Sequence, residues 1–176
     1  MRHAFPGAPP CGLTSATFNT LFFVDHEVLT SDEILSSLKQ GTIVKRLPRT
    51  GDALDAIASF VEIRTAPVDR IVILSHRSAG SLRLSGRDID STVLRDAGEA
   101  MSRIREILAP SAEIVLMSCA TEANSVCRTF LRTLGIATGA TIKAANADIG
   151  GIADWGAFAA ATILVDEAAL KGYCTA

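Results

Sequence analysis

The sequence lacks the features that mark several large classes of protein. No apolar run reaches the roughly eighteen residues that a helix needs to cross a bilayer, so we expect no membrane insertion. A net charge of -2 gives no strongly basic surface, so we expect no nucleic-acid partner. The four cysteines show no CxxC spacing and no adjacent histidine, which argues against a zinc site or a disulfide framework. We expect no metal and no cofactor.

The composition itself is that of an ordinary globular protein. Hydrophobic residues make up 48% of the 176 residues, enough for one core that buries about 70% of the unfolded surface. Residues 1–19 contain Pro and Gly and lack the apolar region of a signal peptide, so they predict a flexible leader. Residues 20–176 contain no internal repeat and no linker, and we expect one domain there.

Apolar runs of strand length alternate with stretches of helical periodicity along this domain. The expected strands are residues 20–25, 42–47, 70–75, 113–118, 141–146 and, least clearly, 157–165. The expected helices are residues 31–38, 51–63, 90–108 and 122–137. Such alternation is typical of parallel βαβ crossovers. It predicts a three-layer α/β fold with a mostly parallel six-stranded sheet and helices on both faces, and residues 78–89 predict a small flap of two extended pieces.

Two of the expected strands end on side chains that can do chemistry. EIVLMSCATE, residues 113–122, is an apolar run that ends on Cys119, and DRIVILSHRSAG, residues 69–80, ends on Ser75 and His76. In an open, mostly parallel sheet, sites form at the carboxyl ends of the strands. If the two strands are neighbours, His76 can serve as general base or ion-pair partner for Cys119, whose thiolate is the nucleophile.

The surroundings of Cys119 bear on this interpretation. A helix expected to begin at about Thr121 would bring the positive end of its dipole near the sulfur. The backbone N–H groups of Arg77 and Cys119 are candidates for an oxyanion hole. The competing interpretation is that Cys119 is a buried packing residue and His76 a hydrogen-bonded structural residue. Cys127, on a helix face, is expected in the core.

The order of these motifs resembles that of the caspase-like superfamily of cysteine peptidases, which includes gingipains and legumains. The resemblance covers about residues 20 to 165 and is carried by SHRSAGSLRLSG, IVLMSCATEA, TGATIKAAN and a Gly-Gly turn before Asp154 and Trp155. The chain is more similar still to an uncharacterised caspase-like domain of large bacterial surface and adhesin-type proteins. The resemblance implies a caspase-like fold, His76 and Cys119 as the catalytic pair, and a peptide or protein substrate.

The resemblance also singles out positions around this pair. Arg77 stands where the family usually has Gly, and Ala120 where the bacterial relatives usually have a polar residue such as Asp. Asp148, Asp154 and Trp155 lie near where caspase-like enzymes build the pocket for the residue preceding the scissile bond. An acid there would favour a basic substrate side chain. The alternatives are solvated loop carboxylates for the two acids and a core position for Trp155.

The leading prediction is a cysteine endopeptidase or a self-processing domain that uses His76 and Cys119. The alternative is a catalytically silent caspase-like module that acts in partner binding or in assembly of a bacterial surface protein. A generic doubly wound binding domain is disfavoured because no Gly-rich phosphate loop follows the first strand. Asp25 and His26 end that strand on the same edge of the sheet, and His26 is a further candidate. Localisation and oligomeric state stay open.

Overall fold

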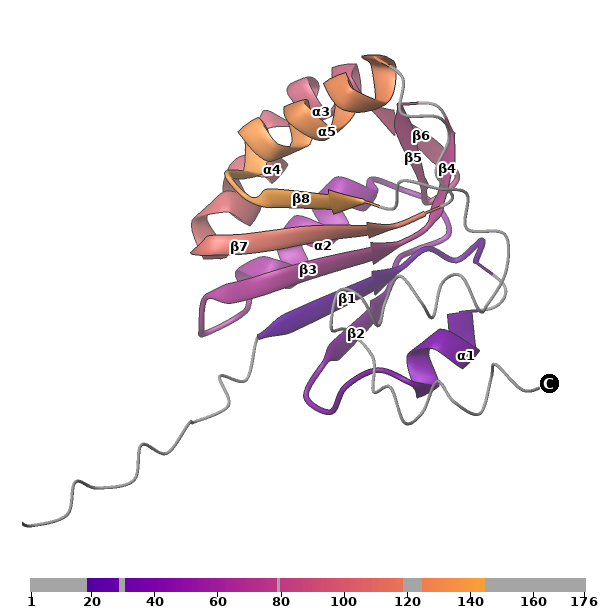
Figure 1. The fold of residues 1–176 in the computed structure, drawn as a ribbon, viewed down its shortest axis with the longest axis vertical. Helices are drawn as coiled ribbons and strands as arrows, with labels where there is room; N and C mark the ends of the chain where they lie inside the picture. The colour runs from indigo at the N-terminus through magenta and orange to yellow at the C-terminus, as the bar shows by residue number, and fades with distance from the viewer. Residues whose placement is uncertain (1–18, 29–30, 79, 119–124, 145–176) are drawn as a thin grey trace, which may run out of the picture.

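A computed structural model of the chain describes residues 19–28, 31–78, 80–118 and 125–144 (Figure 1). The strands are β1 (Thr20–Val24), β2 (Ile43–Arg46), β3 (Val68–Leu74), β4 (His76–Ser78), β5 (Ser81–Leu84), β6 (Arg87–Asp90), β7 (Leu108–Met117) and β8 (Thr141–Ala144). The helices are α1 (Ser31–Ser36), α2 (Ala53–Glu62), α3 (Ser91–Asp96), α4 (Gly98–Ile107) and α5 (Ser125–Thr138). None of the helices described is long and apolar enough to cross a membrane.

Five strands form a parallel central sheet in the order β2-β1-β3-β7-β8. The chain runs from β1 to β2 in one direction along the sheet and then adds β3, β7 and β8 in the other direction. The order therefore reverses between β1 and β3, and at such a point a crevice forms outside the carboxyl ends of the strands. In Figure 1 the arrowheads of these strands point toward the small sheet formed by β4, β5 and β6.

The central sheet is covered on both faces, as the α/β prediction required. On one face, Ile71 and Ile73 belong to a core that also takes side chains from α2, α3, α4 and α5. On the other face, Val72 and Leu74 pack in a smaller core with Ile34 of α1. Figure 1 shows α1 on the opposite side of the sheet from α3, α4 and α5. Because each fully buried aliphatic side chain contributes about 1.5–3 kcal/mol, the unbroken apolar run of β3 suits a central strand.

Several element boundaries differ from those expected from the sequence. The helix expected over residues 90–108 is two helices, because Ala97 ends α3 and Gly98 begins α4. The apolar periodicity continues across the break since Leu94 and Met101 are both buried in the same core. β7 begins at Leu108 rather than near residue 113, with a register shift around Pro110, which cannot donate to the ladder. The sixth strand expected over residues 157–165 lies outside the described residues, as does most of the leader.

The segment expected to be a flap of two extended pieces is an antiparallel sheet of three strands, β4-β5-β6. A two-residue turn joins β5 to β6, with Ser85 at φ 51° and Gly86 at φ 75°. Positive φ at both positions is the pattern of a type I′ hairpin turn. Gly80, between β4 and β5, packs so closely on α5 that a Cβ there would lie 2.3 Å from Cγ1 of Val126. The flap is therefore held against the first turn of α5.

Candidate active site

The strands β1, β3 and β7 end level with one another at the carboxyl edge of the sheet. Val24 pairs with Leu74, and Leu74 pairs with Met117. The residue that follows each of these strands is polar and buried: Asp25, Ser75 and Ser118. The Asp25 N–H donates to the Leu74 carbonyl at 2.8 Å, and the Ser75 N–H donates to the Met117 carbonyl at 3.1 Å. The parallel ladder thus continues one residue into this polar layer.

His76 and Cys119 stand at equivalent distances along the chain from this edge. Each is the second residue after a member of the Leu74–Met117 pair, and the strands that carry them, β3 and β7, are neighbours in parallel register. Cys119 itself lies outside the described residues. The same holds for the other positions implied by the resemblance, Ala120, Asp148, Asp154 and Trp155. Cys127 is buried in α5, as expected.

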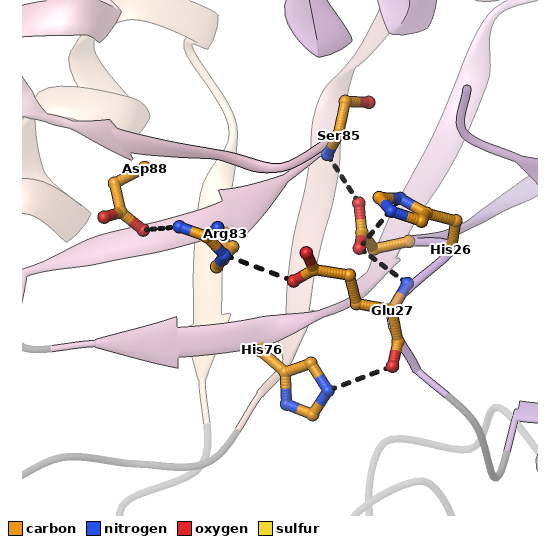
Figure 2. A network of polar contacts seen from close by, with 7 residues as sticks. His26, Glu27, His76, Arg83, Ser85 and Asp88 are labelled. Carbon is orange, nitrogen blue, oxygen red and sulfur yellow. Dashed lines mark hydrogen bonds and ion pairs between the residues drawn. The ribbon is translucent and has the colours of Figure 1, made fainter. Parts of the chain in front are cut away.

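The imidazole of His76 has one described hydrogen-bonding partner, a backbone carbonyl. His76 is exposed, begins β4, and places Nε2 3.3 Å from the carbonyl oxygen of Glu27 (Figure 2). A carbonyl oxygen only accepts, so this contact requires the hydrogen on Nε2. In a neutral ring Nδ1 then carries the lone pair and can take a proton from a thiol. The distance is slightly longer than usual, so the contact is weak.

Asp25 is the most deeply buried charged group at this edge, with a side chain that is 0% exposed. Its Oδ2 accepts the backbone N–H of Ser85 at 2.7 Å, and its Oδ1 accepts the backbone N–H of Glu27 at 3.0 Å. Oδ1 also lies 3.5 Å from Nδ1 of His26. Burial of a carboxylate is costly unless donors replace its water, and two backbone N–H groups do so here (Figure 2).

A second, more exposed network lies beside His76. Arg83 stands directly across from His76 in the β4–β5 pair, and its Nε donates to the Glu27 carboxylate at 3.2 Å. Its Nη1 reaches Asp88 at 3.5 Å. Because Arg83 is 42% exposed and Glu27 33% exposed, each such pair is worth only about 0.2–1 kcal/mol. Glu27 is thus held through its side chain by Arg83 and through its N–H by Asp25.

Three buried serine hydroxyls near this edge have no hydrogen-bond partner among the described residues. They belong to Ser75, Ser85 and Ser118. Such a group costs about 1–3 kcal/mol when it is left unsatisfied in the interior. Unsatisfied polar groups call for an explanation, and a functional role is one of the common explanations.

Arg77, a predicted oxyanion-hole residue, lies in β4 opposite Leu82. Its role and that of the Cys119 N–H stay predictions. The sequence placed Asp25 and His26 at the carboxyl edge of the sheet, and both follow β1 there. It missed Glu27, because a backbone carbonyl has no residue signature that a sequence pattern can report.

A cavity of about 330 Å³ opens beside this edge, between the flap and the starts of α3 and α5. Its lining includes Gly80, Arg95 and Ser125. Gly80 follows β4, which carries His76, and Ser125 begins the helix after the Cys119 segment. Within the described ranges, no three His, Cys, Asp or Glu side chains gather as metal ligands. The lining of this open space carries one acid, Asp90, and one base, Arg95.

The fold and this edge define a three-layer α/β domain with a polar layer at the carboxyl ends of its parallel strands. A family model described as a domain of unknown function (DUF4347) matches residues 21–174, and the chain belongs to that family. The matched range includes His76, Cys119 and every strand of the central sheet except the first residue of β1. No curated protein and no solved structure matches the chain.

Proposed function

We propose that this chain is a caspase-like cysteine peptidase domain in which His76 and Cys119 form the catalytic pair. The observation that carries the proposal is the register of β3 and β7. Leu74 pairs with Met117, and the two candidate residues each follow two positions later. Neighbouring strands in parallel register were the geometric requirement for a pair of this kind, and strands that were not adjacent would have ruled it out.

The contact of His76 with Glu27 supports the same role. With its hydrogen on Nε2, His76 takes the thiol proton of Cys119 at Nδ1, and the thiolate attacks the carbonyl carbon of a peptide bond. Backbone N–H groups of Arg77 and Cys119 donate to the oxyanion. His76 then passes its proton to the leaving amine, and a water that it deprotonates hydrolyses the acyl-enzyme. The carbonyl of Glu27 stabilises the imidazolium between these steps.

The substrate of the proposed reaction is a peptide or protein, either a separate chain or the polypeptide that contains this domain. Asp148 and Asp154 would favour a basic residue before the scissile bond, with Trp155 as an apolar wall of the same pocket. An endopeptidase and a self-processing domain would use the same catalytic pair. They differ only in whether the cleaved bond lies in the same molecule.

A second candidate is a catalytically silent module that binds a partner or serves in assembly of a bacterial surface protein. Arg77 favours this candidate, because a side chain at that position restricts a backbone that Gly would leave free to turn toward an oxyanion. Ala120 favours it too, since it removes the polar group usual after the nucleophile. In this candidate the carboxyl edge would still be the binding surface.

Alkylation by a peptidyl chloromethyl ketone with lysine next to the warhead separates the two candidates. The thiolate displaces chloride from the reagent, and peptide mapping identifies the cysteine that is labelled. We expect Cys119 to react faster than Cys11 and Cys174, and His76→Ala to slow it by about 100-fold, the lower range for a general base. His3→Ala, at a histidine that has no part in the proposal, is the matched control and should keep the rate. Labelling of Cys119 no faster than that of Cys11 would overturn the peptidase proposal.

A further inference from the structure

We propose that Asp25 is a positioning residue for His76 and acts through the backbone of Glu27 and the flap. The proposal rests on the proposed function of His76 as a base. Asp25 does not touch His76 in the structure, and its carboxylate instead joins two segments that between them hold the imidazole. Figure 2 shows the two segments, with the backbone of Ser85 near the turn that contains His26 and Glu27, and His76 at the Glu27 carbonyl.

The first link runs from Asp25 to the flap. The Ser85 N–H lies in the two-residue turn between β5 and β6, outside the pairs of the hairpin, and donates to Oδ2 of Asp25 at 2.7 Å. Ser85 has φ 51°, a left-handed conformation that is unfavourable for a residue with a side chain. A short bond to a buried carboxylate stabilises the turn in this conformation. Because β5 pairs with β4, the same bond sets the position of the strand that carries His76.

The second link runs from Asp25 to the carbonyl that His76 contacts. Glu27 donates its N–H to Oδ1 of Asp25 at 3.0 Å, and its carbonyl oxygen lies 3.3 Å from Nε2 of His76. The N–H and the carbonyl both belong to Glu27, so a fixed direction of the N–H restricts the direction in which the carbonyl points. Asp25 thus fixes both the imidazole, through the flap, and its acceptor, through Glu27.

The chemistry of the two links requires a carboxylate. Both partners are N–H donors, so the side chain must present an acceptor on each of its two terminal atoms. Asparagine has the same shape but presents an acceptor on one atom and a donor on the other. Asp25→Asn therefore keeps one link and sets two donors against each other at the second. A residue that only filled space would tolerate this change.

The test is the tautomer of His76, read by nitrogen-15 NMR of the full chain at a pH where the imidazole is neutral. Signals are assigned by loss in His76→Ala. In the wild type we expect the Nε2–H form, and in Asp25→Asn a mixture with the Nδ1–H form and a roughly tenfold slower alkylation of Cys119. Asp52→Asn, the same change at a carboxylate that accepts the backbone N–H groups of Leu54 and Asp55 at the start of α2, is the control and should leave the tautomer unchanged.

The outcomes distinguish this inference from the proposed function. A wild-type tautomer in Asp25→Asn overturns the positioning role, whether or not Cys119 reacts. A changed tautomer in Asp25→Asn, together with an unreactive Cys119 in the wild type, supports the positioning role and overturns the peptidase proposal. If Asp25→Asn does not fold, the same measurement is made in a Ser85→Gly background. Glycine adopts φ 51° without strain, so the turn there depends less on Asp25.

Discussion

Two regions of the same parallel sheet hold their buried polar groups in different ways. Toward the amino end of β3, Nε and Nη2 of Arg70 donate to Glu113 on the next strand at 3.2 and 2.9 Å. Lys143 on β8 reaches the other oxygen of Glu113 at 2.6 Å. At the carboxyl edge, by contrast, Asp25 accepts backbone N–H groups from a turn and a flap, and nearby serine hydroxyls lack partners among the described residues.

The difference shows two ways in which one sheet can hold polar groups. The Arg70–Glu113–Lys143 group pairs side chains of adjacent strands of the sheet. The hydrogen bonds of Glu113 to Lys143 and then to Arg70 hold the pKa of its carboxyl below the ordinary value. The carboxyl edge instead depends on segments outside the sheet. The turn after β1 and the flap can therefore change the position of the Asp25 carboxylate when they move.

The largest effect on folding is expected from Asp25→Ala. This change leaves the N–H groups of Ser85 and Glu27 without their acceptor in a site that is 0% exposed at Asp25. We expect the free energy of unfolding to fall by about 3 kcal/mol, measured by urea denaturation. The control is Asp32→Ala, at a carboxylate that is 84% exposed, with an expected loss under about 0.5 kcal/mol. Equal losses in the two variants would contradict the prediction.

Glu113→Gln should have the next largest effect. It removes the negative charge that serves both cations, and the Arg70 side chain is only 9% exposed. We expect a loss of about 2 kcal/mol in urea denaturation, because a largely buried cation loses its charged partner. Glu106→Gln on α4, whose carboxylate accepts a hydrogen bond from Ser102 at 3.4 Å, is the control. A loss no larger than that of the control would show that the group adds nothing to stability.

Acid pH should remove the difference in the free energy of unfolding between the wild type and Glu113→Gln. The pKa of Glu113 is lowered in the folded state, so its contribution is fully present above the ordinary pKa of a glutamate carboxyl. It is lost as the pH falls through the lowered value, because the wild-type carboxyl is then protonated like the amide. The difference in unfolding free energy between the two proteins should therefore shrink toward acid pH. A difference that stays constant would mean that charge is not its cause.

The smallest effect is expected at the unpartnered hydroxyls. Ser118→Ala removes a hydroxyl that makes no hydrogen bond within the described part of the chain, so the free energy of unfolding should not fall and should rise by up to about 1 kcal/mol as the cost of burying that hydroxyl is relieved. The matched variant is Ser37→Ala, at a buried hydroxyl that donates to the Ile34 carbonyl at 2.8 Å. It should lose about 1 kcal/mol. A loss at Ser118 would reveal a partner for its hydroxyl.

Residue patterns were enough to predict the layers and the edge at which polar residues gather. The run Ile71–Leu74 predicted a strand covered on both faces, and each of its residues is buried. The predicted boundaries of helices and strands were less accurate where one residue pattern fits more than one structure. A helix that continues past Ala97 and two helices that share one buried face produce the same apolar spacing. The flap was predicted from its glycines, but its third strand was not.

The sequence by itself determined that buried apolar strands give way to the polar residues Asp25, Ser75 and Ser118, because burial and strand length follow from the order of apolar residues. Only the tertiary structure decided which strands are neighbours, and hence that Leu74 pairs with Met117. It alone also assigned the Glu27 carbonyl to His76 and the Ser85 N–H to Asp25. Backbone groups are the same in every residue, so their partners depend on how distant segments meet in space and leave no mark in the sequence.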